Sequence, residues 1–393
     1  MDSIHLRIPG PTPIPPRIQQ AMLAPMIGHR SGDFKRLYAE VTAKLPPLFG
    51  TRQRVLVLTA SGTAALEAAA VNAVAPGEEV IVVVTGAFGD RFAAICERYG
   101  FVTHRLEVTW GEAADPDRLR AFLRQHPKAK AVFLTYCETS TGVLNPVAEL
   151  ARVVREESEA LVIVDGVSAI GGAPCEMDGW GLDIVVTGSQ KALMLPPGLA
   201  LVAVSERAWQ VIEANPAPRF YLDLLAYRKA AEEASSPYTP AVSLFFGLRE
   251  ALAMIEEETL DAAIARHALL RDMTRAAIKA LNLPLLADDA AASPTVTAVG
   301  PFDGSTLDPE DLRACLRKRH GLVLAGGQKK LKGRIFRIGH MGWCAPFDIL
   351  AVIAALETGL AELGYPVALG KGVQAAQEVY VRHVSRAHHG SAI

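Results

Sequence analysis

The sequence predicts an α/β fold in which a mostly parallel sheet has helices on both faces. The main observation is that apolar, strand-like runs alternate with segments of helical spacing between residues 55 and 214. Such alternation is typical of parallel strands joined by helical crossovers. A second observation is that two of the runs end in charged residues, Asp165 and Lys191. In open α/β sheets, ligands bind at the carboxyl ends of the strands.

Seven runs predict the strands of the main sheet. In order, they are Val55–Thr59, Val80–Thr85, Phe101–Val108, Ala131–Tyr136, Leu161–Asp165, Asp183–Thr187 and Leu199–Val204. The helices expected between them are Ala64–Val74, Asp90–Tyr99, Pro116–Gln125 and Pro146–Glu156. The seventh run follows the loop at Lys191 with no helix in between, so we expect one antiparallel strand.

The second half of the chain predicts a smaller α/β unit. Residues 241–281 have helical spacing almost throughout, which is too long for one ordinary helix, so a break is expected near Glu258. The elements expected after it are the strands Thr295–Val299 and Arg334–Ile338 and the helices Pro309–His320 and Pro346–Leu363. We divide the chain into an arm (1–20), a large domain (21–255), a small carboxyl-terminal domain (256–370) and a solvated polar tail (371–393).

Composition excludes several classes of protein. The 40 basic and 42 acidic residues give a net charge of −2, which does not indicate binding to nucleic acid or to an anionic membrane. The five cysteines are scattered and odd in number, which favours free thiols in a reducing compartment over disulfides or a metal site. No apolar signal core or membrane-spanning stretch is evident. We expect a cytoplasmic protein that acts on small molecules.

Lys191 and Asp165 are the most informative residues. A lysine at the end of a buried strand needs a reason, because burial of an unpaired ammonium costs free energy or forces deprotonation. A strand-end lysine with a strand-end aspartate is the pattern of pyridoxal phosphate enzymes, in which the lysine forms a Schiff base and the carboxylate pairs with the pyridinium nitrogen. Alone, the pair favours a solvated lysine and an N-capping aspartate, and the remaining motifs reverse that preference.

Three other strand ends have residues suited to a phosphorylated ring. Ser61, Gly62 and Thr63 open a helix whose free N–H groups could donate to phosphate, although a plain N-cap is the alternative. Phe88, between two glycines, could stack on a flat ring or pack under the following helix. The hydroxyls around Thr139 could meet a phenolic oxygen or form a local turn.

Arg337 lies inside an expected strand of the small domain. An arginine that faces inward is rarely left unpaired, and its planar fork matches a carboxylate in bidentate fashion. A substrate carboxylate and a structural salt bridge are both compatible with the sequence.

With these pieces placed, the chain resembles the class V aminotransferases of the alanine–glyoxylate and serine–pyruvate group. The resemblance covers nearly everything except the tail. The most specific segments are Ser140-Thr141-Gly142-Val143-Leu144, Val164-Asp165-Gly166-Val167-Ser168, Gly188-Ser189-Gln190-Lys191-Ala192-Leu193, Pro196-Pro197-Gly198, Tyr238-Thr239-Pro240 and Phe336-Arg337-Ile338-Gly339-His340.

The resemblance implies a fold-type I pyridoxal phosphate enzyme, with a seven-stranded sheet, that acts as a homodimer. It implies the Schiff-base role for Lys191 and the ring-nitrogen role for Asp165. Carboxylate binding by Arg337 and an arm at Gly10 that covers the partner's active site are also implied. The expected cofactor-binding residues are Ser61, Gly62, Thr63, Phe88, Thr139, Asp165, Val167, Gln190, Lys191, Tyr238 and Thr239, with Thr239 reaching in from the other subunit; no metal is expected.

The function expected from the resemblance is transfer of an amino group from alanine or serine to glyoxylate or pyruvate. No second arginine stands in a matching motif, so dicarboxylic donors are expected to trail by orders of magnitude. Alternatives are another amine (aminoethylphosphonate, ureidoglycine or pyridoxamine), or a lyase or cysteine desulfurase. A desulfurase would need a histidine before the lysine, where Gln190 stands. A non-catalytic binding protein would leave Lys191 and Arg337 unexplained.

Overall fold

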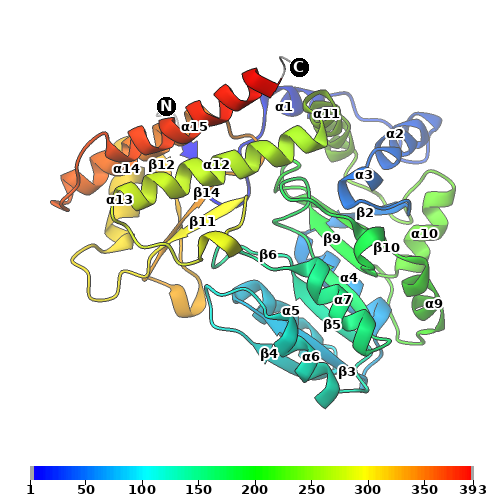
Figure 1. Ribbon diagram of the computed structural model, residues 1–393. Coiled ribbons are helices and arrows are strands. Elements are labelled where there is room, and N and C mark those ends of the chain that lie inside the picture. The colour runs from blue at the N-terminus through cyan, green and yellow to red at the C-terminus, as the bar shows by residue number, and fades with distance from the viewer. Residues whose placement is uncertain (1–3, 391–393) are drawn as a thin grey trace.

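A seven-stranded sheet forms the centre of the larger part of the molecule (Figure 1). The computed structural model describes residues 4–390. The strand order is β2-β10-β9-β8-β5-β3-β4. Their bounds are β2 Val55–Ala60, β3 Glu79–Val84, β4 Val102–Glu107, β5 Ala131–Thr135, β8 Leu161–Asp165, β9 Ile184–Gly188 and β10 Gly198–Val204. Strand β10 is antiparallel to both neighbours, whereas the other pairs are parallel. The predicted fold class is confirmed.

Helices enclose this sheet because its central strands are apolar on both sides. Every residue of β5, β8 and β9 is buried, and successive side chains of a strand point to opposite faces. Both faces are therefore covered. The helices of this part are α2 Gly32–Ala43, α3 Pro46–Phe49, α4 Gly62–Ala73, α5 Ala87–Arg98, α6 Pro116–Gln125, α7 Val147–Glu157, α8 Met177–Trp180, α9 Glu206–Ala214 and α10 Leu224–Glu232. A short hairpin is formed by β6 Cys137–Glu138 and β7 Val143–Leu144.

Two long helices lead from the sheet to the small unit. They are α11, Val242–Glu258, and α12, Leu260–Ala280. The expected break lies between them at Thr259, which has a positive φ of 71° and whose hydroxyl accepts a hydrogen bond from the N–H of Ala262 at 3.2 Å. This hydroxyl caps the new helix, so the chain changes direction without losing its first hydrogen bonds.

The small unit has a three-stranded antiparallel sheet in the order β11-β14-β13. The strands are β11 Val296–Val299, β13 Ala325–Gly326 and β14 Phe336–Gly339, and the helices are α13 Pro309–His320 and α14 Pro346–Glu362. These agree with the predicted elements, apart from the short β13. The amino-terminal β1, His5–Leu6, pairs in parallel with β12, Leu322–Val323.

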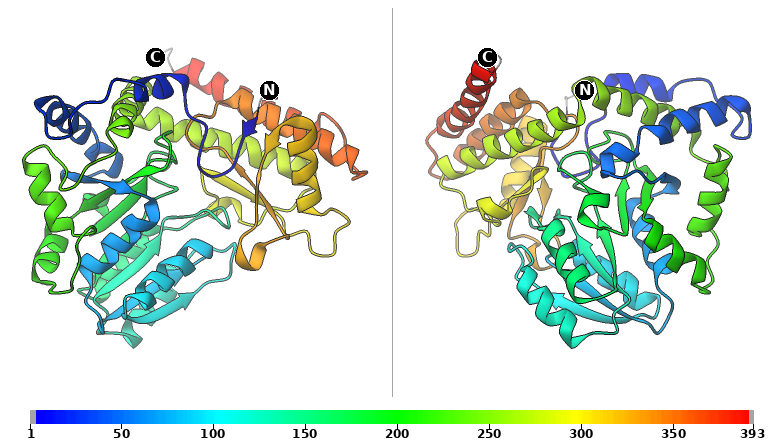
Figure 2. Two further views of the ribbon diagram at one scale, coloured as in Figure 1. Left: turned by 180° about the vertical axis from the view of Figure 1, so that it is seen from behind. Right: turned by 45° about the vertical axis from the view of Figure 1, so that its right-hand side comes forward.

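The amino-terminal arm joins the two units. After β1 it passes across the molecule to α1, Pro16–Met22, which packs on α11 (Figure 2, left). The buried apolar side chains form two main clusters, one around the seven-stranded sheet and one among α12, α13, α14 and the small sheet. The predicted domain boundaries at residues 20, 255 and 370 stay predictions. No helix within residues 4–390 is long and apolar enough to cross a membrane.

The prediction of a solvated tail is wrong for residues 371–390. Helix α15, Lys371–Gly390, packs against α12 and α14, and its Ala376 is fully buried. The buried carboxylate of Glu357 accepts hydrogen bonds from the N–H groups of Gly370 at 2.7 Å and Gly372 at 2.6 Å, which holds the start of the helix. Polar residues on the outer face hid this inner apolar stripe from the sequence analysis. Residues 391–393 lie outside the described residues.

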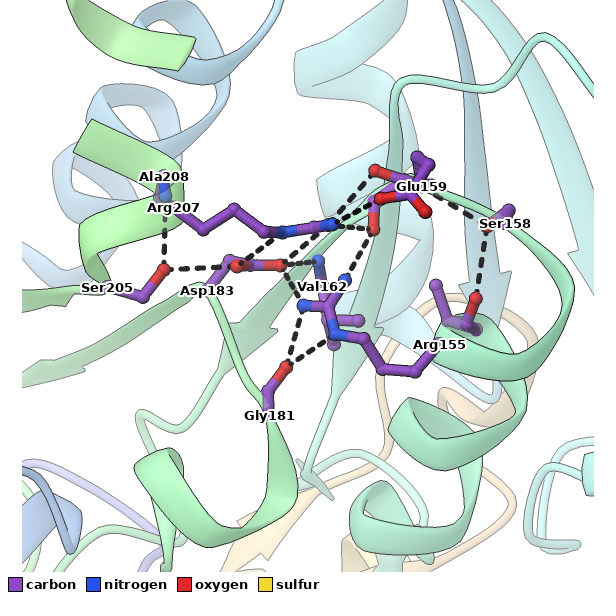
Figure 3. A network of polar contacts seen from close by, with 11 residues as sticks. Arg155, Ser158, Glu159, Val162, Gly181, Asp183, Ser205, Arg207 and Ala208 are labelled. Carbon is purple, nitrogen blue, oxygen red and sulfur yellow. Dashed lines mark hydrogen bonds and ion pairs between the residues drawn. The ribbon is translucent and has the colours of Figure 1, made fainter. Parts of the chain in front are cut away.

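A buried ion network fixes the amino end of β9 (Figure 3). Asp183 is 2% exposed and accepts a hydrogen bond from the N–H of Val162 at 2.7 Å. Its carboxylate also forms ion pairs with Arg155 of α7 and with Arg207 of α9, the latter at 3.3 Å. One carboxylate thus ties two helices and two strands together.

We expect Asp183→Ala to lower the free energy of unfolding by about 3–5 kcal/mol, because it leaves the part-buried guanidinium of Arg155 without its anion and removes the buried anion of Arg207. Urea denaturation followed by far-UV circular dichroism measures the loss. The control is Asp303→Ala, which removes an exposed ion pair with Arg334 and should cost less than about 1 kcal/mol. Equal losses in the two variants would contradict the structural role of Asp183.

Candidate active site

The carboxyl ends of five strands of the large sheet surround a cavity of about 280 Å³. It receives residues that follow β2, β3, β5, β8 and β9, as predicted for a parallel sheet. Among the predicted site residues, those that line it are Gly10, Ser61, Gly62, Thr63, Phe88, Thr139, Asp165, Val167, Gln190 and Lys191. Residues up to 181 positions apart in the sequence (191 − 10) therefore meet at one place.

Lys191 follows β9 and is only 8% exposed. Its Nζ donates a hydrogen bond to the carbonyl of Pro9 at 3.1 Å, and no carboxylate of the described residues forms an ion pair with it. Burial lowers the pKa of this amine to about 8, with help from the positive charges of Arg337 and Arg91 and against Cys137 and Asp165. A substantial fraction of Lys191 is therefore neutral near pH 8.

Asp165 ends β8 and is 4% exposed. Its carboxylate accepts a hydrogen bond from the N–H of Val167 at 2.9 Å. Burial raises its pKa to about 6, and the buried carboxyl of Glu138 adds to the rise, while the Val167 N–H and Lys191 oppose it. Because this value stays below 7, Asp165 is mainly ionised at neutral pH.

The amino end of helix α4 faces the cavity and can hold an anion. Ser61 is both the N-cap, accepting from the N–H of Ala64 at 3.4 Å, and a cavity residue. The N-cap is therefore present, and phosphate binding by this segment stays a prediction. Across from it, Oε1 of Gln190 is buried and has no hydrogen-bond partner among the described residues. Free N–H groups at a helix start bind phosphate, and an amide beside them can add a donor.

Phe88 lies at the start of α5, and its ring lines the cavity. The guanidinium of Arg91 lies over this ring, 4.8 Å from the centroid. The N–H groups of Phe88 and Gly89 donate to the carboxylate of Glu138, at 3.1 and 3.0 Å. Glu138 is fully buried, and burial raises its pKa. This carboxylate was not among the predicted site residues, although a charged residue three positions after a buried strand was a usable signal.

Arg337 lines a second, larger cavity of about 580 Å³ that shares Gly10, Phe88, Thr139 and Lys191 with the first. Its guanidinium is held by two carbonyls, Gly326 O at 2.9 Å and Thr139 O at 3.0 Å. Among the described residues it has no carboxylate partner, so the structural salt bridge considered above is absent there. Burial lowers the pKa of Arg337 to about 10, so it remains a cation at neutral pH.

Two predicted cofactor residues do not reach either cavity of their own chain. Tyr238 stacks on Tyr221, with centroids 5.0 Å apart, and donates to the carbonyl of Phe220 at 2.9 Å. Thr239 is exposed. Neither residue lines the cavities that contain Lys191 and Arg337.

The expectation that the arm at Gly10 covers the partner's site stays a prediction. The arm lies on Lys191 of the same chain, and the hydroxyl of Thr12 donates to the carbonyl of Lys191 at 3.0 Å. The physical reason is that β1 is fixed to β12 of the same chain, which leaves the next residues beside the lysine.

Several cavity residues were not predicted as site residues, and all of them except Ser168 lie outside the motifs quoted above. They are Arg91, Cys137, Ser168, Glu310, Arg313 and Lys332. Arg313 is important because the sequence analysis assumed that no second arginine was available. Cys137 is a buried thiol whose pKa is raised by burial to about 11, so it stays protonated, unlike the thiolate that a desulfurase needs.

Two groups elsewhere could in principle hold a metal ion. Glu79, His104 and His126 form one, and Cys315, His320 and Glu362 form the other. In each group a carboxylate oxygen already pairs with a histidine, at 3.1 Å for His104 and 3.5 Å for His320. Neither group touches the cavities described above.

Comparison with known families agrees with this geometry. The sequence profile named Aminotransferase class-V matches residues 10–339. The match covers most of the 393 residues, and the chain belongs to the class V aminotransferases. These enzymes depend on pyridoxal phosphate, so the predicted family, enzyme class and cofactor are confirmed.

Relatives with different names match over nearly the whole chain. The chain is 47% identical to "Soluble hydrogenase, small subunit" of Synechococcus sp. (96% of this chain, 98% of that protein). It is 35% identical to the L-aspartate–glyoxylate aminotransferase of Paracoccus denitrificans, over 95% of each protein. It is also 35% identical to the serine–glyoxylate aminotransferase of Methylorubrum extorquens, over 96% of each. The solved pyridoxamine–pyruvate aminotransferase of Mesorhizobium loti superposes with a TM-score of 0.92 (33% identity, 98% of both chains).

We expect Gly10→Ala to lower kcat/KM by about 10- to 100-fold, because small displacements of a reacting group carry costs of this size. A Cβ at Gly10, which has φ +152°, would lie 2.9 Å from Cδ, Cε and Nζ of Lys191 and force the side chain to move. The matched control is Gly304→Ala, at φ +74° with no atom within 4 Å, which should leave activity unchanged. Similar losses in both variants would show that backbone strain, and not contact with Lys191, is responsible.

Proposed function

We propose that this aminotransferase moves an amino group from a small amino acid, alanine or serine, to glyoxylate or pyruvate. The observation that carries the proposal is the buried, unpaired amine of Lys191 beside the carboxylate of Asp165 and the cation of Arg337. The names of two relatives at 35% identity support glyoxylate as an acceptor, and the name of the solved pyridoxamine enzyme supports pyruvate.

The residues around the first cavity fit pyridoxal phosphate. The start of α4 with Ser61, Gly62 and Thr63, together with Gln190, would hold its phosphate. Phe88 would stack on the ring, and Thr139 and Val167 would border it. Asp165 would pair with the ring nitrogen, because a buried carboxylate stabilises a cation beside it. When bound, the cofactor supplies a carbonyl for the amino group and a ring that accepts electrons from the substrate Cα.

Lys191 supplies the proton transfer. A lysine must lose its charge to act as a base, and burial favours the neutral amine. The neutral amine takes the proton from the substrate Cα and later returns a proton, so one group acts as base and then as acid. Pro9, whose carbonyl accepts from Nζ, fixes the position of the free amine.

Arg337 binds the substrate's α-carboxylate. Its guanidinium is fixed by the carbonyls of Gly326 and Thr139, which leaves the remaining N–H groups for a ligand. The guanidinium of Arg337, buried in the lining of the second cavity, orients the carboxylate so that the Cα proton points toward Lys191. The wall of the second cavity keeps bulk water from one side of this ion pair.

The enzyme works as a homodimer in the cytoplasm. Thr239 is exposed and Tyr238 lies in a cluster of aromatic rings with Phe220, which is 79% exposed. Such a surface supports contact with a second copy, through which Thr239 would reach the partner's phosphate site. The five free cysteines support a reducing compartment.

The proposed function is tested by a panel of donors and acceptors with purified enzyme. We expect turnover with alanine or serine and glyoxylate or pyruvate. Lys191→Ala should lower the rate by at least about 10³-fold and remove the visible absorption band of the bound cofactor. An enzyme without turnover for any of these pairs would overturn the substrate assignment, and a Lys191→Ala variant that keeps its rate would overturn the role of the lysine.

Arg337→Ala should raise KM and lower kcat/KM by about 10- to 100-fold for every α-carboxylate substrate, because a charge-assisted hydrogen bond is worth about 1.5–3 kcal/mol. Arg337→Lys should recover only part of this, since it keeps the charge without the fork. The control is Arg334→Ala, which changes an exposed arginine just before strand β14. Steady-state kinetics with several acceptors measures the loss for each substrate. A loss confined to one substrate would contradict this role of Arg337.

A further inference from the structure

The second cavity contains more cationic groups than one α-carboxylate needs. Besides Arg337, its wall includes Arg313 and Lys332, with Glu310 as the acidic residue beside them. The cavity also touches Lys191 and Phe88, so a substrate bound at Lys191 extends toward these groups. What the additional cations bind decides which donors and acceptors the enzyme prefers.

Arg313 and Arg337 flank a single residue of β13, Gly326. The carbonyl of Gly326 accepts from Nε of Arg337 at 2.9 Å. On its other side, a Cβ at Gly326 would lie 2.5 Å from Nη1 of Arg313 and 2.9 Å from Oε1 of Glu310. Only a glycine leaves room for this approach. The two guanidinium groups are near enough that the charge of Arg313 adds to burial in lowering the pKa of Arg337.

The existing partners of Arg313 leave it able to bind an anion. Its Nε donates to the carbonyl of Leu324 at 3.0 Å, which fixes the guanidinium, and Nη1 pairs with Glu310. The Arg313 and Glu310 side chains are 28% and 48% exposed. An ion pair this open to water contributes little, so it exchanges partners at small cost.

Lys332 is a further free cation at the same wall. In its loop, Lys329 pairs with Asp90 and Lys330 lies 5.1 Å from the ring centroid of Trp110. Lys332 forms no ion pair with any of the described residues and lines the cavity. The lysines of this loop thus differ, because Lys329 and Lys330 have partners within the protein and Lys332 has no ion pair among the described residues.

We propose that Arg313, with Lys332 beside it, binds a second carboxylate on the substrate, so that short dicarboxylic amino acids such as aspartate are donors in addition to neutral ones. The inference rests on the proposed function, since it assumes that Arg337 holds the α-carboxylate. With a neutral donor, Arg313 stays paired with Glu310. With an acidic donor, Arg313 exchanges Glu310 for the substrate's distal carboxylate. This replaces the expectation that acidic donors trail, which assumed a pocket without a second arginine.

The test measures kcat/KM for aspartate and for alanine with glyoxylate as the acceptor. Arg313→Gln should lower the aspartate-to-alanine ratio by about 10- to 100-fold, the value of a charged hydrogen bond. Arg313→Lys should recover part of the ratio, and Glu310→Gln should raise it by removing the competing anion. The matched control is Arg317→Gln, an exposed arginine one turn further along α13, which should not change the ratio.

A binding measurement separates recognition from chemistry. Succinate and butyrate have four carbons each but two and one carboxylates, and each is tested as an inhibitor of alanine turnover. Succinate should inhibit at a lower concentration than butyrate, and Arg313→Gln should remove about tenfold of that advantage. An unchanged ratio in Arg313→Gln, or succinate no better than butyrate in the parent, overturns the inference. A different result would be a parent enzyme that is inactive with alanine but turns over aspartate in a manner that depends on Arg313. That result would overturn the proposed neutral donors and leave the role of Arg313 standing.

Discussion

The burial of the Lys191 amine without an acidic partner is the constraint on which the rest of the site depends. A buried charge is normally paired, and an unpaired one destabilises the fold unless a ligand or a lowered pKa relieves it. Here the amine has only the carbonyl of Pro9, while Arg337 and Arg91 add positive charge nearby. Asp165 and Glu138, two buried carboxyl groups, offset that charge at a distance. The site is stable as a whole, although its lysine is not locally neutralised.

Strand β9 shows the difference between a structural and a functional buried charge. At its amino end, Asp183 is paired with two arginines and a backbone N–H. At its carboxyl end, Lys191 has no ion pair with the described residues. The first arrangement fixes helices to the sheet, and the second keeps a reactive group available. The two arginines differ in the same way. Arg155 forms an ion pair with Asp183 of the protein, whereas the hydrogen bonds of Arg337 go only to carbonyls.

The fold was predictable because its signals are local. Alternating apolar and helical segments determined the seven strands, and the motifs at their ends placed Ser61, Asp165 and Lys191 at one edge. What escaped prediction depends on tertiary contacts. Helix α15 is polar on one face, and only its packing on α12 reveals Ala376 as core. Glu138 and Arg313 belong to no substrate-binding motif, and they became site residues only when distant segments met. The contact of the arm with Lys191 of its own chain likewise depends on a tertiary contact, the pairing of β1 with β12.

The amino-terminal arm connects the two units and contacts Lys191 on its way. The backbone of Arg7 is hydrogen-bonded to Val323 at 2.9 Å and Gly339 at 2.8 Å, both in the small unit. Five residues later, Thr12 is bonded to Gln190 and Lys191 of the large unit. The carbonyl of Pro9 lies within this short bridge. Any displacement of the small unit relative to the large sheet would therefore be transmitted by this arm to the hydrogen bond at Nζ.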